Sequence, residues 1–504
     1  MPITVSKESP VSELPQTRLL SIKQLAFSYR AKPALQGINW DWELGDHWAI
    51  LGANGAGKTT LATIISGEQT RFAGSLERSD QLCAGGTAYV CFERGRRLYE
   101  RDQKLDCAEF ESNARDIGTR VRDLLPTQGC SAQEWDDIVK LLDMQNILDR
   151  GLRYISTGQM RKALLASALL SKPTLLILDS PLDGLDVATQ RRLSEALNSI
   201  MMQTTAVLTL CRSPEEIPSA CTRLMLLERG RILAKGAPQD VLSSPDGQRA
   251  LKAPPLEFAL PPSKAVSQTP ASSEPTIELK DVSVSFGELC VFRDLNWRMD
   301  QKQHSLIAGP NGCGKSTLLD LLTGDNHKAY GQDVSLFGQR RGSGESVWEI
   351  KAHFGRVDAR MQFAVPNGSS VEAVVLSGFF DSIGLRDRPS DQQRGTARQW
   401  LSALGLATKQ KTEFHTLSFG LQRLVLLARA MVKDPTVLLL DEATLSLDPG
   451  HRGLLLDAVD HVVDEGRCQL LFVSHTAGEL PRCINQLLQF EPGEDGSKVL
   501  VSDR

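Results

Sequence analysis

The strongest constraint on the fold is that the chain carries the same pattern twice. The segment GANGAGKT at 52–59 returns as GPNGCGKS at 309–316, an offset of 257 residues. Further along, Gly158 lies 21 residues before Asp179, and Gly420 lies 21 residues before Asp441, an offset of 262. The five residues gained between the two patterns fit an insertion in a surface loop. The sequence therefore predicts two homologous domains in tandem.

Both short segments fit the pattern GxxxxGK[ST], and each follows an apolar run and opens a helical pattern. Glycines in such a loop let backbone N–H groups turn toward phosphates, the lysine reaches the β and γ phosphates, and the next hydroxyl takes Mg²⁺. The pattern predicts two nucleotide sites. The expected nucleotide-contacting residues are Gly52, Asn54, Gly55, Gly57, Lys58, Thr59 and Thr60 in the first loop, and Gly309, Asn311, Gly312, Gly314, Lys315, Ser316 and Thr317 in the second.

Each half also contains an apolar run that ends in an acidic residue, LLILDS up to Ser180 and VLLLDE up to Glu442. A buried strand that exposes an aspartate at its carboxyl end brings that carboxylate near Mg²⁺ and the next residue near the γ-phosphate. The predicted metal ligands are Thr59, Asp179, Ser316 and Asp441.

Apolar runs of strand length alternate with segments of helical spacing such as LASALLS and LLARAMV. This alternation predicts an α/β fold in which helices flank a mostly parallel sheet. We expect an N-terminal extension at 1–16, a first domain at 17–250, a linker rich in Pro and Ser at 251–275, and a second domain at 276–504. The tether favours intramolecular pairing of the halves, and hence a monomer.

Composition indicates in which compartment the protein works and which partners it binds. No apolar stretch reaches the roughly 20 residues that cross a bilayer, and the N-terminus lacks the apolar core of a signal peptide, so we expect a cytosolic protein. The ten cysteines form no CxxC pair and are expected to be free thiols. A formal net charge of −4 gives no strong signal for nucleic acid.

The segments ISTGQMRKALL from Ile155 and LSFGLQRLVLL from Leu417 precede the two acidic strands. With them, the chain resembles the ABC ATPase superfamily, which implies two ABC nucleotide-binding domains, each with an antiparallel β portion and a helical signature subdomain. The resemblance implies that ATP and Mg²⁺ bind where the phosphate loop of one cassette faces the signature of the other. By that rule Ser156, Gly158 and Gln159 complete the Lys315 site, while Ser418, Gly420 and Gln422 complete the Lys58 site, although Leu421 stands at the glutamine position of the family.

Tyr29 and Phe286 each lie 29 residues before the lysine of a phosphate loop. They match the aromatic residue that stacks on adenine in this superfamily. The alternative is that each is a core residue at the end of a strand.

The resemblance also implies that the two sites are unequal. Glu442 matches the carboxylate that positions or activates water, and His475 matches the histidine that senses the γ-phosphate. Ser180 and Cys211 stand at the corresponding positions of the first half, and a hydroxyl cannot replace a carboxylate base. We therefore expect ATP hydrolysis mainly at the Glu442 site.

Two segments, from Ser335 and from Val374, are similar to a tandem-cassette branch that is grouped with molybdate transport. That similarity implies a membrane permease as partner, at the cytoplasmic face of the inner membrane. Phe379 and Phe380 are then candidate docking residues, with core packing as the alternative. Neither half places Gln at the glutamine loop, where Glu93 and Gln362 are out of register, so a soluble ATPase with a regulatory or repair-linked role is the second hypothesis.

Overall fold

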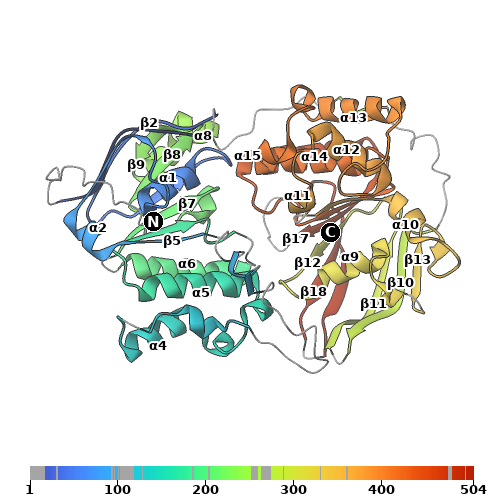
Figure 1. Ribbon diagram of the computed structural model, residues 1–504. Helices are drawn as coiled ribbons and strands as arrows, with labels where there is room; N and C mark the ends of the chain where they lie inside the picture. Colours follow the sequence, from blue (N-terminus) through green and yellow to red (C-terminus); the bar gives the residue numbers. More distant parts are fainter. Residues whose placement is uncertain are drawn as a thin grey trace, which may run out of the picture. The chain divides into compact units, whose positions relative to one another are not determined.

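The computed structural model describes residues 17–29, 32–91, 95, 97–99, 101–102, 118–127, 129–183, 185, 187–202, 205–250, 259–262, 274–287, 289–329, 331–358, 361–474, 480–493 and 495–504. The chain divides into two compact units, Met1–Lys252 and Ala253–Arg504 (Figure 1). Each unit contains one antiparallel sheet and one larger, mostly parallel sheet.

The first unit has a three-stranded antiparallel sheet in the order β2-β1-β4 and a six-stranded sheet in the order β5-β6-β7-β3-β8-β9. Only β9, at the edge, runs antiparallel to its neighbour in the larger sheet. The strands are β1 (Arg18–Tyr29), β2 (Lys32–Glu43), β3 (Trp48–Leu51), β4 (Ala73–Arg78), β5 (Thr87–Val90), β6 (Leu175–Asp179), β7 (Ala206–Cys211), β8 (Arg223–Glu228) and β9 (Arg231–Gly236).

Helices cover both faces of this larger sheet. In Figure 1, α1 lies on one face and α5 and α6 lie on the other, which agrees with the cores that their apolar residues join. The helices of the first unit are α1 (Lys58–Ser66), α2 (Asp80–Gly85), α4 (Ala132–Leu141), α5 (Thr157–Leu170), α6 (Val187–Met201), α7 (Pro238–Ser243) and α8 (Pro245–Ala250).

The second unit repeats the larger sheet of the first strand for strand, and its antiparallel sheet has one further strand, β14. Its larger sheet has the order β15-β16-β17-β12-β18-β19, and its antiparallel sheet has the order β11-β10-β13-β14. The strands are β10 (Ile277–Phe286), β11 (Leu289–Met299), β12 (Ser305–Ala308), β13 (Asp333–Leu336), β14 (Gln339–Arg340), β15 (Phe354–Asp358), β16 (Val437–Asp441), β17 (Gln469–Ser474), β18 (Gln486–Glu491) and β19 (Lys498–Asp503). The helices are α9 (Lys315–Thr323), α10 (Val347–His353), α11 (Met361–Ala364), α12 (Val371–Leu376), α13 (Asp391–Ala403), α14 (Phe419–Met431) and α15 (Pro449–Asp464).

The central strands explain why the apolar runs are continuous. Successive side chains of a strand point to opposite faces, and both faces of these parallel sheets are covered. In β6, Leu175 and Ile177 join the core shared with the antiparallel sheet and α1, whereas Leu176 and Leu178 join the core under α5 and α6. The first polar residue, Asp179, therefore emerges at the carboxyl end of the strand, as the sequence predicts.

The α/β fold expected from the sequence is confirmed, and part of the expected linker has a defined environment. Leu260 packs against the core of the second unit, and Arg467 donates a hydrogen bond to the carbonyl of Pro261. This short piece thus belongs to the second unit, while most other residues of 251–275 lie outside the described ranges. Phe379 is partly buried against the same core, which favours core packing for that residue.

Among the described residues, no helix combines the length and the apolar character needed to cross a bilayer. The nine cysteines in this part of the chain are all free thiols.

Candidate nucleotide-binding sites

The first phosphate loop connects β3 to α1 through two glycines in the left-handed region. Gly55 has φ = 82° and Gly57 has φ = 103°. A Cβ at Gly57 would lie 2.6 Å from the carbonyl oxygen of Ala34, so only glycine fits there. Lys58 is 7% exposed, and its Nζ donates hydrogen bonds to the carbonyls of Gly52 and Ala53, the latter at 3.1 Å. The ammonium is thereby held against the loop.

The second phosphate loop repeats this geometry between β12 and α9. Gly312 has φ = 82° and Gly314 has φ = 106°. Lys315 is 6% exposed, and its Nζ donates to Gly309 O at 2.9 Å and to Pro310 O at 2.8 Å. Both lysines thus take the position that the sequence pattern predicts, at the N-terminus of a helix whose dipole favours phosphate.

The predicted metal ligands of the first half meet in the structure. The Oγ1 atom of Thr59 donates a hydrogen bond to Asp179 Oδ2 at 2.7 Å. A hydroxyl and a carboxylate are oxygen donors of the kind that Mg²⁺ prefers, with phosphate and water completing its shell, so these residues fit the ion. In the second half Ser316 is the second residue of α9, and Asp441 ends β16 with 8% exposure, which supplies the same donor types.

The two candidate adenine-stacking residues are exposed at the ends of their strands. Tyr29, the last residue of β1, is 56% exposed, and Phe286, the last residue of β10, is 48% exposed. Core residues would be buried, so this exposure favours the stacking role. Lys328 Nζ lies 5.9 Å from the centroid of the Phe286 ring.

The two signature segments begin helices α5 and α14. Ser156 caps α5: its Oγ accepts from Gln159 N at 3.2 Å, and its N–H donates to Gln159 Oε1 at 2.9 Å. Ser418 caps α14 by accepting from Leu421 N at 3.4 Å. Gln422 is buried and donates to Leu417 O at 3.0 Å, so its amide supports the signature loop from inside. That placement differs from the nucleotide-contacting role expected for Gln422.

The family model described as ABC transporter matches residues 35–183 and 292–445, which include both phosphate loops and both acidic strands. The chain belongs to this family, with two cassettes in tandem. Domains of this family bind ATP, generally with Mg²⁺.

A relative from Escherichia coli (strain K12), the ABC transporter ATP-binding protein ModF, is 36% identical over 486 residues, covering 94% of this chain and 97% of its own. An uncharacterized ABC transporter ATP-binding protein of Schizosaccharomyces pombe is 22% identical and covers 92% of this chain and 96% of its own. Among solved structures, the archaeal ribosome recycling factor aABCE1, in complex with the ribosomal stalk protein aP1, has a TM-score of 0.59 at 17% identity, over 95% of this chain and 89% of its own. At that identity the structural likeness concerns the fold alone.

The two ABC cassettes differ at the residue after the acidic strand. Ser180 and Glu442 occupy equivalent turns of the two cassettes, with φ of 49° and 50°. Ser180 is 4% exposed, and its Oγ donates to Asp179 Oδ1 at 3.3 Å. The backbone thus presents both residues alike, and only the side-chain chemistry changes.

Cys211, the last residue of β7, does not stand at the histidine position expected from the sequence. It lies opposite Leu51 as Ser474 lies opposite Ala308, so Arg212 is the counterpart of His475. Cys211 is fully buried, and its Sγ donates to the carbonyl of Glu216 at 3.6 Å. Burial raises the pKa of the Cys211 thiol well above its usual range. The side chain is therefore part of the core of the first cassette. His475 lies outside the described residues.

Two residues near the predicted metal ligands were not singled out from the sequence. The hydroxyl of Tyr89 donates to Asp179 Oδ2 at 3.2 Å, and Arg356 Nη2 lies 4.0 Å from Asp441 Oδ2. Burial, together with the negative charge of Asp179, raises the pKa of Tyr89, so its hydroxyl keeps its proton. Both residues lie on the strand that precedes the expected glutamine loop. That position in the sequence is the signal that could have identified them. Gln362 is buried at 3% exposure, and Glu93 lies outside the described residues.

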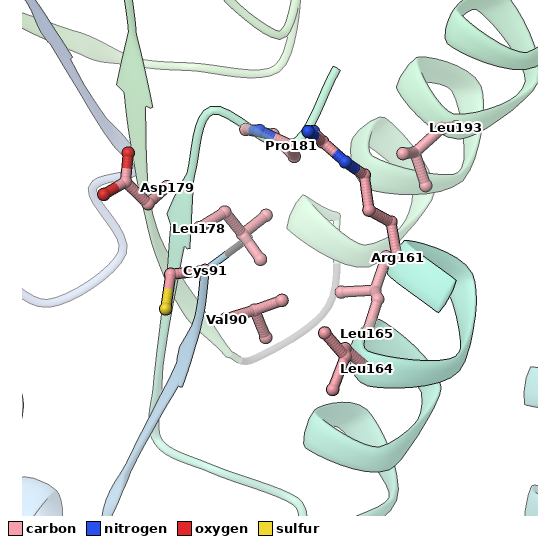
Figure 2. Close-up of a pocket in the computed structure, with 9 residues that line it drawn as sticks. All are labelled: Val90, Cys91, Arg161, Leu164, Leu165, Leu178, Asp179, Pro181 and Leu193. Carbon is pink, nitrogen blue, oxygen red and sulfur yellow. The ribbon is translucent and has the colours of Figure 1, made fainter. Parts of the chain in front are cut away.

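A small cavity lies beside the acidic strand of the first cassette. Figure 2 shows Cys91 and Asp179 at the ends of neighbouring strands on one side of it, and Arg161 extending from α5 toward Pro181 on the other. Arg161 Nη1 donates to Ser180 O at 2.7 Å. The cavity volume of about 20 Å³ is sufficient for a water molecule and far too small for a nucleotide.

Proposed function

We propose that this protein is an ATPase that binds ATP with Mg²⁺ at both phosphate loops and hydrolyses it mainly at the site that contains Glu442. The observation that carries the proposal is the matched pair Ser180 and Glu442, presented by the same backbone turn in two cassettes whose phosphate loops have the same geometry. ATP hydrolysis needs a group that orients water toward the γ-phosphate. A carboxylate does this, and a serine hydroxyl does not.

The Lys58 site keeps the groups that bind a nucleotide but lacks those that drive turnover. Lys58, Thr59 and Asp179 have the contacts expected of a phosphate and metal site. Ser180 is engaged with Asp179, and Cys211 belongs to the core. We infer that ATP bound there is retained and keeps the cassettes associated, while ATP at the Lys315 site turns over.

In the family relationship that supports this proposal, each site is completed by the signature of the other cassette. Ser156, Gly158 and Gln159 would complete the Lys315 site, and Ser418 and Gly420 would complete the Lys58 site. A capped helix N-terminus offers N–H groups to the γ-phosphate. Ser156 forms a reciprocal capping box with Gln159, whereas Ser418 is held by a single capping hydrogen bond.

The decisive experiment compares the same substitution at the two matched positions. Glu442→Gln removes the positioned carboxylate and should lower kcat for ATP by about a hundred- to ten-thousand-fold, with ATP binding retained. Ser180→Gln is the matched control and should leave kcat close to that of the unmodified protein. Steady-state phosphate release measures both, and equal losses in the two variants would contradict the proposal.

We further propose that the protein supplies ATP-driven work to a membrane permease linked to molybdate. The support is the printed name of the Escherichia coli relative, an ABC transporter ATP-binding protein, at 36% identity. The alternative is an ATPase with a regulatory or repair-linked role and no membrane partner. One observation favours the alternative. Transporters rely on a glutamine loop near the acidic strand, and in this region Tyr89 and Arg356 contact the acidic strands instead. Co-purification of an integral membrane protein with ATP-trapped Glu442→Gln distinguishes the two roles.

A further inference from the structure

Arg356 places a fixed positive charge beside a predicted metal ligand of the second cassette. It lies on β15, which pairs in parallel with β16 so that Asp358 is opposite Asp441. The Nη2 atom of Arg356 is 3.3 Å from Asp358 Oδ2 and 4.0 Å from Asp441 Oδ2. A guanidinium is never deprotonated in proteins, so this charge is permanent.

The other end of the guanidinium is held by the helix that follows the phosphate loop. Arg356 Nη1 lies 3.2 Å from Asp320 Oδ1 on α9 and 3.4 Å from Asp325 Oδ2 just beyond it. The Arg356 side chain is 22% exposed, whereas those of Asp320 and Asp325 are 40% and 37% exposed. Solvent therefore screens these two carboxylates more than it screens the contact of Arg356 with Asp441.

The first cassette has a neutral group in the same place. β5 pairs with β6 so that Tyr89 is opposite Ile177, two residues before Asp179, just as Arg356 is opposite Leu439, two residues before Asp441. The Tyr89 hydroxyl donates to Asp179 at 3.2 Å.

Two of the carboxylates that hold Arg356 are also replaced by neutral residues in the first cassette, while Asp325 corresponds to the acidic Glu68. Cys91, the residue after β5, corresponds to Asp358, and Thr63 on α1 corresponds to Asp320. The same strand position therefore gives a charged contact to one acidic strand and a neutral one to the other.

We propose that Arg356 is a positioning residue that weakens the binding of the divalent cation at the Glu442 site, so that the Lys58 site holds its metal and nucleotide more tightly. A positive charge at Asp441 repels an incoming cation and shares the carboxylate that the cation needs. The Tyr89 hydroxyl also donates to Asp179, but it is uncharged and does not repel a cation. This inference rests on the proposed function and gives it a physical basis, since faster release of metal and ADP suits the site that turns over.

The test uses Mn²⁺ as a probe for the metal and ADP as the nucleotide, so that no hydrolysis occurs. In the full-length Lys58→Ala chain only the second loop binds, and electron paramagnetic resonance of free Mn²⁺ gives the dissociation constant of the ion. Arg356→Gln should lower that constant about tenfold, the usual effect of one charge at this range. Arg356→Lys keeps the charge and should restore it. Tyr89→Phe in the Lys315→Ala chain, the matched neutral change, should have a smaller effect than Arg356→Gln.

An unchanged constant in folded Arg356→Gln would overturn the inference. Should that variant not fold, the Lys58→Ala and Lys315→Ala chains are compared directly: tighter Mn²⁺ binding at the Lys58 site supports the inference, and equal or weaker binding overturns it. A complete lack of ADP-dependent Mn²⁺ binding in both chains would instead contradict the proposed function itself.

Discussion

Ser180 and Glu442 show how one residue changes the chemistry of a retained backbone. Each is held with φ near 50°, a left-handed conformation that costs a residue with a Cβ about 1–2 kcal/mol. The first cassette keeps that cost although its serine cannot orient water as a carboxylate does. We infer that the turn is retained because it positions Asp179, which accepts a hydrogen bond from Thr59, and not because Ser180 takes part in hydrolysis.

The thiol of Cys211 gives a prediction about the same site. Because burial raises the pKa of this thiol, it stays protonated and shielded at pH 8, whereas Cys83 is exposed. Iodoacetamide should therefore modify Cys83 in the native protein and leave Cys211 unmodified until the chain unfolds, with or without ATP. Mass spectrometry of the labelled peptides measures both. Labelling of Cys211 that ATP slows would mean that the thiol faces the nucleotide.

Local motifs could be predicted from the sequence because their geometry is set by neighbours in the chain. The loops at Lys58 and Lys315 need only a strand, glycines and a helix N-terminus in succession. Tyr89 and Arg356 could not be assigned in this way, because their contacts depend on which residue of the neighbouring strand lies opposite. The inward turn of Gln422 likewise depends on the loop that it supports.

At the scale of an element, α14 is constrained by α15 through one close contact. A Cβ at Gly420 would lie 2.1 Å from Cγ of His451, whose Nδ1 is 2.8 Å from Asp448 Oδ2. At the corresponding place in the first cassette, a Cβ at Gly158 would meet Leu185 at 3.0 Å. The second signature is therefore the more tightly packed of the two.

This contact predicts a coupled pair of substitutions. Gly420→Ala should lower the free energy of unfolding by about 1–3 kcal/mol through overpacking, although alanine favours a helix. His451→Ala removes the ring, so the double variant should lose less stability than the sum of the single losses. Denaturant titration measures all three. If the losses in free energy of unfolding were strictly additive, the His451 ring would not be what opposes a side chain at Gly420.

At the scale of the whole molecule, the two cassettes share one architecture and differ in the residues around the acidic strand. The larger sheets of the two cassettes have the same strand order, and both lysines are held by the carbonyls of their loops. The cassettes differ around the acidic strand. Glu442 in the second cassette corresponds to Ser180 in the first, and Arg356 corresponds to Tyr89. The duplication could be predicted from spacing alone, but the attachment of Leu260 to the second core could not, because composition is typical of a linker there.

The nucleotide content of the working protein tests most directly whether the two sites are unequal. The unmodified chain is incubated with ATP and Mg²⁺, separated rapidly from free nucleotide, denatured with acid, and its bound nucleotides are resolved by chromatography. The account predicts ATP and ADP in about equal amounts, with ATP retained at the Lys58 loop and ADP at the Lys315 loop. Recovery of ADP alone, at two molecules per chain, would contradict it.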